Sequence, residues 1–268
     1  MKMNDYKQQV KQFFNRRTAY DQEGGFHPLL ADLLLECVQL QKGQKILDIA
    51  TGTGLIAIPA AQMVGTEGYV VGVDMSPGML SQARQKIEAL GLQNIELIEA
   101  DAEYLNFDDD SFDVIFCSSA LVYLADIPAV FKNWYRWLKK GGIVAFSCFS
   151  ETSFTTPIII KACAKHGVSL LNINEPLSRS QKCHNLLKQA GFQEIEVKTK
   201  QLGEYLSLSD RRLSWDGRFW FHPTGNPLLQ LSQDQLEKLQ AEYRAEVENL
   251  ASDEGVWYNI ATFFVLAR

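Results

Sequence analysis

Residues 46–54 read ILDIATGTG, which joins a short apolar segment to a turn almost without side-chain bulk. A strand that ends in a glycine-rich turn and leads into a helix lets backbone amides approach a ligand closely. Gly-x-Gly alone is weak evidence, because turns also use glycine for their geometry. The second apolar strand, YVVGVD, ends at Asp74, 20 residues after Gly54. In nucleotide-binding α/β folds a carboxylate at this spacing accepts hydrogen bonds from ribose hydroxyls.

The glycine turn excludes two common nucleotide sites. No Gly-Lys-Ser/Thr follows it, so it is not a P-loop. The third glycine of G-x-G-x-x-G is also missing, and the carboxylate of Asp48 would repel a pyrophosphate. S-adenosylmethionine carries an ammonium and a sulfonium but no phosphate. We therefore expect Gly52 and Gly54 to admit this cofactor, with Asp48 facing its cationic amino-acid end.

Composition limits the class of protein. The chain has 268 residues, 46% of them hydrophobic, and a net charge of −6. This charge predicts no binding of nucleic acid, and no apolar run approaches the ~18 residues of a membrane span. The start of the chain shows no signal peptide, and the five scattered cysteines form no CxxC. We expect a cytoplasmic protein with reduced thiols, no membrane insertion and no metal site.

Strands and helices alternate along the chain, which predicts a parallel sheet covered by helices. We expect one domain, 1–268, with an N-terminal helical lid (1–42), a cofactor-binding half (43–150) and a substrate-side half (151–268) that carries an insertion at about 203–255. The expected strands are 45–50, 69–74, 94–100, 111–119, 141–149, 194–202 and 255–268. The expected helices are 5–17, 28–40, 55–64, 77–90, 126–138, 153–167, 180–190 and 233–250.

Over residues 45–150 the chain resembles class I S-adenosylmethionine-dependent methyltransferases, in the group of ubiquinone/menaquinone-biosynthesis enzymes. The resemblance lies in ILDIATGTG, VVGVDMSPGML, IELIEADAEYL, SFDVIFCSSALVYLAD and WLKKGGIVAFS. It implies a Rossmann-like, doubly wound sheet of seven strands, mostly parallel with an antiparallel C-terminal strand. Two positions depart from the family. Ala50 replaces the first glycine of the turn, and Tyr123 stands where many relatives carry histidine.

The resemblance also implies roles for individual residues. Asp74 would bind the ribose, Asp101 would accept from the adenine amino group, and Ser118 would contact the methionine moiety. The dipeptide Tyr20-Asp21 is similar to the lid that covers the cofactor in this family. The implied cofactor contacts are Tyr20, Asp48, Ala50, Gly52, Gly54, Asp74, Met75, Met79, Asp101, Ala102 and Ser118.

The predicted function is methyl transfer to an O, N or C nucleophile of a small, largely apolar or aromatic acceptor. The segments outside the cofactor half are rich in aromatic residues, which suits such an acceptor. His27 is the candidate for a base or a substrate contact, although its place before Pro28 also fits a simple helix start. Two alternatives stay open, a protein methyltransferase and a non-catalytic cofactor-binding partner or sensor. The oligomeric state is left open. The expected substrate-lining residues are Tyr123, Phe149, Trp215 and Trp220.

Overall fold

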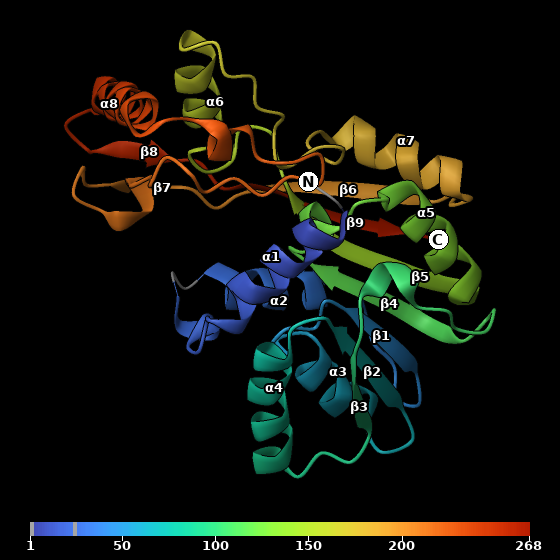
Figure 1. The fold of residues 1–268 in the computed structure, drawn as a ribbon. Helices are drawn as coiled ribbons and strands as arrows, with labels where there is room; N and C mark the ends of the chain where they lie inside the picture. Colours follow the sequence, from blue (N-terminus) through green and yellow to red (C-terminus); the bar gives the residue numbers. More distant parts are fainter. Residues whose placement is uncertain (1–2, 24–25) are drawn as a thin grey trace.

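The computed structural model describes residues 3–23 and 26–268. Its central sheet has seven strands in the order β3-β2-β1-β4-β5-β9-β6 (Figure 1). Neighbours are parallel except at β9, which runs antiparallel to both β5 and β6. The expected fold class is confirmed. The sheet strands are β1 (Lys45–Ile49), β2 (Tyr69–Asp74), β3 (Ile95–Glu99), β4 (Phe112–Ser118), β5 (Leu138–Phe149), β6 (Ile195–Gln201) and β9 (Ala261–Ala267).

The helices that pack on this sheet lie on both of its faces (Figure 1). None of the described helices is both long and apolar enough to cross a membrane. The first helix, α1, is expected as part of the lid and lies across the edge of the sheet (Figure 1). These helices are α1 (Met3–Asn15), α2 (Phe26–Glu36), α3 (Ala57–Val64), α4 (Pro77–Leu90), α5 (Ile127–Trp137) and α7 (Ser180–Ala190).

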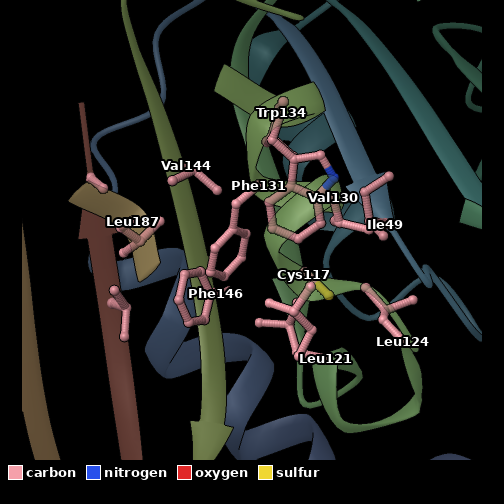
Figure 2. Packing of buried hydrophobic residues seen from close by; sticks show 14 of the residues in the cluster. Ile49, Cys117, Leu121, Leu124, Val130, Phe131, Trp134, Val144, Phe146 and Leu187 are labelled. Atoms are coloured by element: carbon pink, nitrogen blue, oxygen red, sulfur yellow. The ribbon is translucent and has the colours of Figure 1, made fainter. Parts of the chain in front are cut away.

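Alternation along the buried strands supplies a core on each face of the sheet. In β1, Leu47 and Ile49 pack in one cluster with α5 and α7, whereas Ile46 packs in another with α2 and α3. Figure 2 shows the first cluster, where the rings of Phe131 and Phe146 stack with centroids 5.3 Å apart. Both faces are buried, as expected for parallel strands made of continuous apolar runs. The sheet is therefore a rigid base for the loops at its carboxyl edge.

Residues 202–260 and α6 (Thr156–Lys165) form a separate layer, which we call the cap, beside the lid (Figure 1). Its own core includes Leu213, Leu228, Leu239 and Tyr243. The cap contains β7 (Glu204–Leu206) paired with β8 (Val256–Tyr258), and α8 (Gln233–Asn249) packs on α6. Short 3-10 turns complete the described chain: η1 (Tyr20–Gln22), η2 (Ala102–Tyr104), η3 (Leu121–Tyr123), η4 (Arg211–Leu213) and η5 (Pro227–Gln230).

The prediction of one strand over 255–268 is wrong. The chain leaves the β7–β8 pair at Asn259, whose side chain donates to the carbonyl oxygen of Thr152 over 2.8 Å, and then enters the central sheet as β9. Local patterns predicted other boundaries well. Ser76 caps α4, Gly91 ends it with φ of +65°, and Ser232 and Gln235 form a capping box at the start of α8. Helix α2 begins two residues earlier than expected, at Phe26.

Candidate active site

A cavity of about 580 Å³ lies at the carboxyl edge of the central sheet. It adjoins the ends of β1 and β4, between which the order of the strands reverses direction. Open α/β sheets bind their ligands at this switch point. The lid, the glycine turn and the cap all contribute to its walls. The predicted site residues that line it are His27, Tyr20, Asp48, Ala50, Gly52, Asp74, Met75, Met79, Asp101, Ala102, Ser118, Tyr123, Phe149, Trp215 and Trp220.

Gly54 is the predicted cofactor contact that does not line the cavity. A Cβ atom on Gly54 would lie 2.8 Å from Cδ1 of Ile58 and 3.6 Å from Cβ of Ala83. Its φ of +83° is also unfavourable for other residues. Gly54 is thus needed for close packing of the turn against α3 and α4. Gly52 differs, because a Cβ there would meet only the Ala50 carbonyl oxygen at 3.9 Å, and Gly52 lines the cavity.

Asp74, at the end of β2, is held in place by the backbone. Its Oδ2 accepts from the amide of Gly52 and its Oδ1 from the amide of Ser76, each over 2.8 Å. Burial raises the pKa of this carboxyl, and the hydrogen bonds from backbone amides oppose that shift. A carboxylate has about four acceptor positions, so Asp74 keeps acceptor capacity for a ligand hydroxyl. The side chain therefore fits the ribose role that the spacing predicts.

Asp48 is almost fully buried beneath the glycine turn. Its Oδ2 accepts from Oγ1 of Thr51 over 2.6 Å, and burial raises the pKa of the carboxyl to about 7. Among the described residues it forms no ion pair with a basic side chain. A buried carboxylate of this kind gains stability from a cationic ligand, which agrees with its predicted role.

The lid contributes Lys7, which the sequence analysis missed. Its Nζ lies 3.2 Å from Oδ1 of Asp101 and forms a second ion pair with Glu103, and all three side chains are largely buried. Asp101 is therefore oriented by a cation from α1, 94 residues away in the sequence. The spacing of residues along α1 does not predict this contact, because the contact forms only when the lid packs beside the end of β3.

The lid is closed by polar contacts as well as by aromatic packing. Asp21 accepts from Oγ1 of Thr53 over 2.5 Å and pairs with Lys86 of α4. Asn15 Oδ1 accepts from the hydroxyl of Ser76 over 2.7 Å. These contacts fasten the lid to the glycine turn and to α4. The cofactor-covering lid expected from Tyr20-Asp21 is therefore consistent with the structure.

We expect Asp21→Ala to accelerate dissociation of S-adenosylhomocysteine several-fold, because it removes both contacts that fasten η1. The side chains of Asp21 and Lys86 are about one third exposed, so the effect on melting temperature is expected to be small. Displacement kinetics with labelled ligand measure the rate, and Asp32→Ala on the exposed side of α2 is the control. An unchanged rate in Asp21→Ala would show that these contacts do not retain the ligand.

Aromatic rings enclose the cap side of the cavity. Phe154 packs edge-on against Phe149 at 4.7 Å between ring centroids, and Tyr123 packs against Phe14 of the lid at 5.2 Å. Trp220 is 5% exposed and belongs to both the cavity wall and the cap core, whereas Trp215 is only partly buried. This side of the cavity suits a flat, apolar molecule.

His27 stacks on Tyr20 with ring centroids 4.7 Å apart and an interplanar angle of 22°. Desolvation by burial, aided by the charge of Arg17, lowers its pKa to about 4. An imidazole with this pKa is a weak base at neutral pH. The position of His27 in the cavity wall is compatible with the expected substrate contact, and the lowered pKa disfavours the role of a base.

Backbone strain is concentrated around the cavity. Four described residues other than glycine have positive φ, and three of them line it: Ala50 (55°), Ser119 (57°) and Phe154 (61°). Such conformations cost on the order of 1–3 kcal/mol each and often occur at functional sites. At Ser119 the strain is offset by the buried hydroxyl of Ser147, which accepts from the Ser119 amide over 2.9 Å.

Comparison with known protein families shows to which family the chain belongs. The profile of the ubiE/COQ5 methyltransferase family matches residues 2–172. The chain belongs to this family. Methyltransferases of the family use S-adenosylmethionine and act on small molecules.

Three relatives illustrate the similarity in sequence. Aklanonic acid methyltransferase DauC of Streptomyces sp. is 30% identical over 220 residues, which is 76% of this chain and all of that protein. Demethylmenaquinone methyltransferase of Geobacillus stearothermophilus is 32% identical, covering 62% of this chain and 78% of that protein. The UbiE C-methyltransferase of Haemophilus ducreyi is 37% identical over 48% of this chain and 51% of that protein.

Solved structures share the fold at low sequence identity. A phosphoethanolamine N-methyltransferase 2 from Haemonchus contortus, bound to S-adenosylhomocysteine, superposes with a TM-score of 0.61 at 20% identity over all of this chain and 60% of that one. The [4+2]-cyclase SpnF gives 0.60 at 18% identity over 98% and 96% of the two chains. The fold therefore occurs with different chemistries, and the family match carries the assignment as a methyltransferase.

The residues of this family member fit the cofactor. The carboxylates of Asp48, Asp74 and Asp101 line the side of the cavity formed by the strand ends, and the glycine turn contributes no basic side chain. This set suits a ligand with cationic groups and hydroxyls and without phosphate. The positions of Asp74, Asp48 and Asp101 are consistent with the expected contacts to the ribose, the amino-acid end and the adenine, and Lys7 orients Asp101.

Proposed function

We propose that the protein methylates an acidic oxygen, or a carbon conjugated with it, on a small, largely apolar aromatic acceptor. The observation that carries this proposal is the aromatic cap side of the cavity, together with a lining imidazole that is a poor base. Among the described lining residues His27 is the one imidazole, and its pKa is lowered to about 4. An acidic phenol, an acidic enol or a carboxylic acid ionises near or below neutral pH without a strong base, whereas an alkylammonium group, with a pKa of roughly 10, keeps its proton.

Bound S-adenosylmethionine supplies an electrophilic methyl group: the acceptor's electron pair forms the new bond to the methyl carbon while the bond to sulfur breaks and its electron pair stays on sulfur. The protein's contribution is to hold both reactants and to exclude water. The closed lid covers the β1–β4 side of the cavity, and the rings of Phe149, Phe154 and Trp220 cover the cap side. The names of two relatives, for aklanonic acid and demethylmenaquinone, support an acceptor of this kind.

A paired acceptor screen tests the proposed function. The protein is incubated with methyl-labelled cofactor and with phenols, 1,3-diketones and aromatic carboxylic acids, each matched with an amine of the same ring size. We expect turnover of acidic acceptors and none of the matched amines. Turnover confined to amines, or to peptides, would show that the acceptor class is wrong.

We expect Trp215→Ala to lower kcat/KM for such an acceptor by roughly tenfold while changing cofactor affinity by less than twofold. The indole ring belongs to the cap, 5.4 Å from the ring of Tyr243, and lines the cavity. Loss of a partly buried aromatic contact costs about 1–2 kcal/mol. Steady-state kinetics and calorimetric titration separate the two effects.

The matched control for this prediction is Trp257→Ala. Trp257 is 43% exposed on β8 and does not line the cavity. Equal losses of cofactor affinity and turnover in Trp215→Ala would instead assign Trp215 a purely structural role in the cap.

Two further proposals concern the location of the protein in the cell and its binding of nucleic acid. The five cysteines are unpaired, which supports a reducing, cytoplasmic location. The net charge of −6 supports an absence of binding to nucleic acid. Steeply salt-dependent retention of RNA in a filter assay would contradict the second proposal.

A further inference from the structure

Arg17 is a partly buried cation in the wall of the cavity whose role the family motifs do not assign. Its side chain is 19% exposed, and its guanidinium carbon lies 4.4 Å from the ring centroid of Tyr20. The rings of Phe13 and Phe14 lie 5.5 and 5.6 Å from the same atom. Three aromatic faces therefore hold this guanidinium in position, with little water around it.

Only part of the hydrogen-bonding capacity of Arg17 is used. Its Nε donates to Oε2 of Glu23 over 2.6 Å, and its backbone carbonyl accepts from Gln82 of α4 over 2.9 Å. Within residues 3–23 and 26–268, no partner of Nη1 or Nη2 is found. Both atoms belong to a side chain that lines the cavity. Charged donors without a protein partner are available to a ligand, and a guanidinium favours an anionic one.

The position of Arg17 points to the acceptor as the source of that anion. The ring of Phe13, beside the guanidinium, packs against Phe219 and Phe221 of the cap at 5.3 and 5.2 Å between centroids. Arg17 thus lies where the lid meets the cap, next to the aromatic side of the cavity. The titratable groups that face it are Glu23 and Tyr20 of the lid, His27 of α2 and Tyr123 of η3.

We infer that the Nη atoms of Arg17 bind the acceptor's oxyanion and hold the acceptor in its ionised, reactive form. This inference rests on the proposed function and deepens it, because it names the group that would stabilise the ionised acceptor, for which the imidazole of His27 is too weak a base. The acceptor's proton passes to solvent, and Arg17 keeps its own proton because a guanidinium does not titrate near neutral pH. The planar fork can pair with a carboxylate, a phenolate or an enolate. Arg17 would select acidic acceptors by charge.

A binding experiment without turnover tests this inference. 4-Nitrophenol, whose phenolate absorbs visible light, is titrated with pH on the protein saturated with S-adenosylhomocysteine. The bound phenol is expected to have a pKa about one unit below that of the free phenol in the wild type. Arg17→Gln is expected to abolish this shift, and Arg17→Lys to keep part of it. Arg16→Gln, an exposed neighbour on the same segment, is the matched control.

Three results separate the possible failures. The same pKa of bound 4-nitrophenol in the wild type and in Arg17→Gln would overturn the inference. A loss of tenfold or more in affinity for S-adenosylhomocysteine in Arg17→Gln would also overturn it, because the anion would then be the cofactor's own carboxylate. The acceptor screen tests the proposed function separately. If the wild type methylates amines and not acidic acceptors, the proposed function is wrong. Melting temperatures of the variants confirm that each is folded.

Discussion

Asp74→Ala is expected to weaken binding of S-adenosylhomocysteine by roughly 30- to 1000-fold. Two charge-assisted hydrogen bonds to the ribose would be lost, at about 2–4 kcal/mol together. The same change removes the acceptor of the Gly52 and Ser76 amides, so the glycine turn also loses its anchor. Calorimetric titration of the purified variant measures the loss.

A conservative variant separates the two effects of this change. Asp74→Asn keeps one acceptor oxygen for the turn and removes the charge, so it is expected to bind with intermediate affinity. The exposed Asp253→Asn serves as the control for a lost carboxylate elsewhere. Unchanged affinity in Asp74→Ala would refute the ribose assignment, and tight binding of NADH would refute the choice of cofactor.

Asp48→Asn is expected to stabilise the ligand-free protein while weakening cofactor binding. The pKa of this carboxyl is raised from 3.8 to about 7, mainly by burial. The folded state therefore binds the proton more tightly than the unfolded state, and stability falls as the pH rises from about 4 to 7. Above pH 7 the full cost of the buried charge is present. Asparagine removes that cost and still offers an oxygen to Thr51.

The expected gain in the free energy of unfolding is at most roughly 4 kcal/mol at pH 8 and shrinks towards pH 4. Denaturant titrations at several pH values between 5 and 8 measure it. Cofactor binding by the wild type should weaken below pH 7, where the carboxyl of Asp48 becomes protonated, and the variant should lack this pH dependence. A variant that is less stable than the wild type at pH 8 would contradict the account of Asp48.

Sequence patterns predicted the sheet because the strands are buried on both faces and the helices carry local end signals. Ser76 and Gly91 bound α4 through contacts within a few residues, so the sequence alone locates both ends. The β7–β8 pair was missed for the opposite reason. β7 has three residues and is defined by pairing with residues about 50 positions later, at Val256–Tyr258.

The part of the site that consists of sequence motifs could be predicted from the sequence. Asp48, Gly52 and Asp74 stand at fixed places relative to strand ends, and the structure brings them to one cavity. Lys7 and Arg17 could not be found in this way. They lie on the lid, and their role depends on how it packs across residues that are 65 to 94 positions away. Gly54 belongs to the glycine motif, but it packs against Ile58 and Ala83 and does not line the cavity.

The central claim is that one cavity holds the cofactor on its carboxylate side and leaves the aromatic side for an acceptor. A crystal structure with S-adenosylhomocysteine tests it most directly. The account predicts the ribose on Asp74, the adenine near Asp101 and the sulfur facing open space bounded by Phe154 and Trp215. A ligand whose adenine or amino-acid end fills that aromatic space would contradict the account.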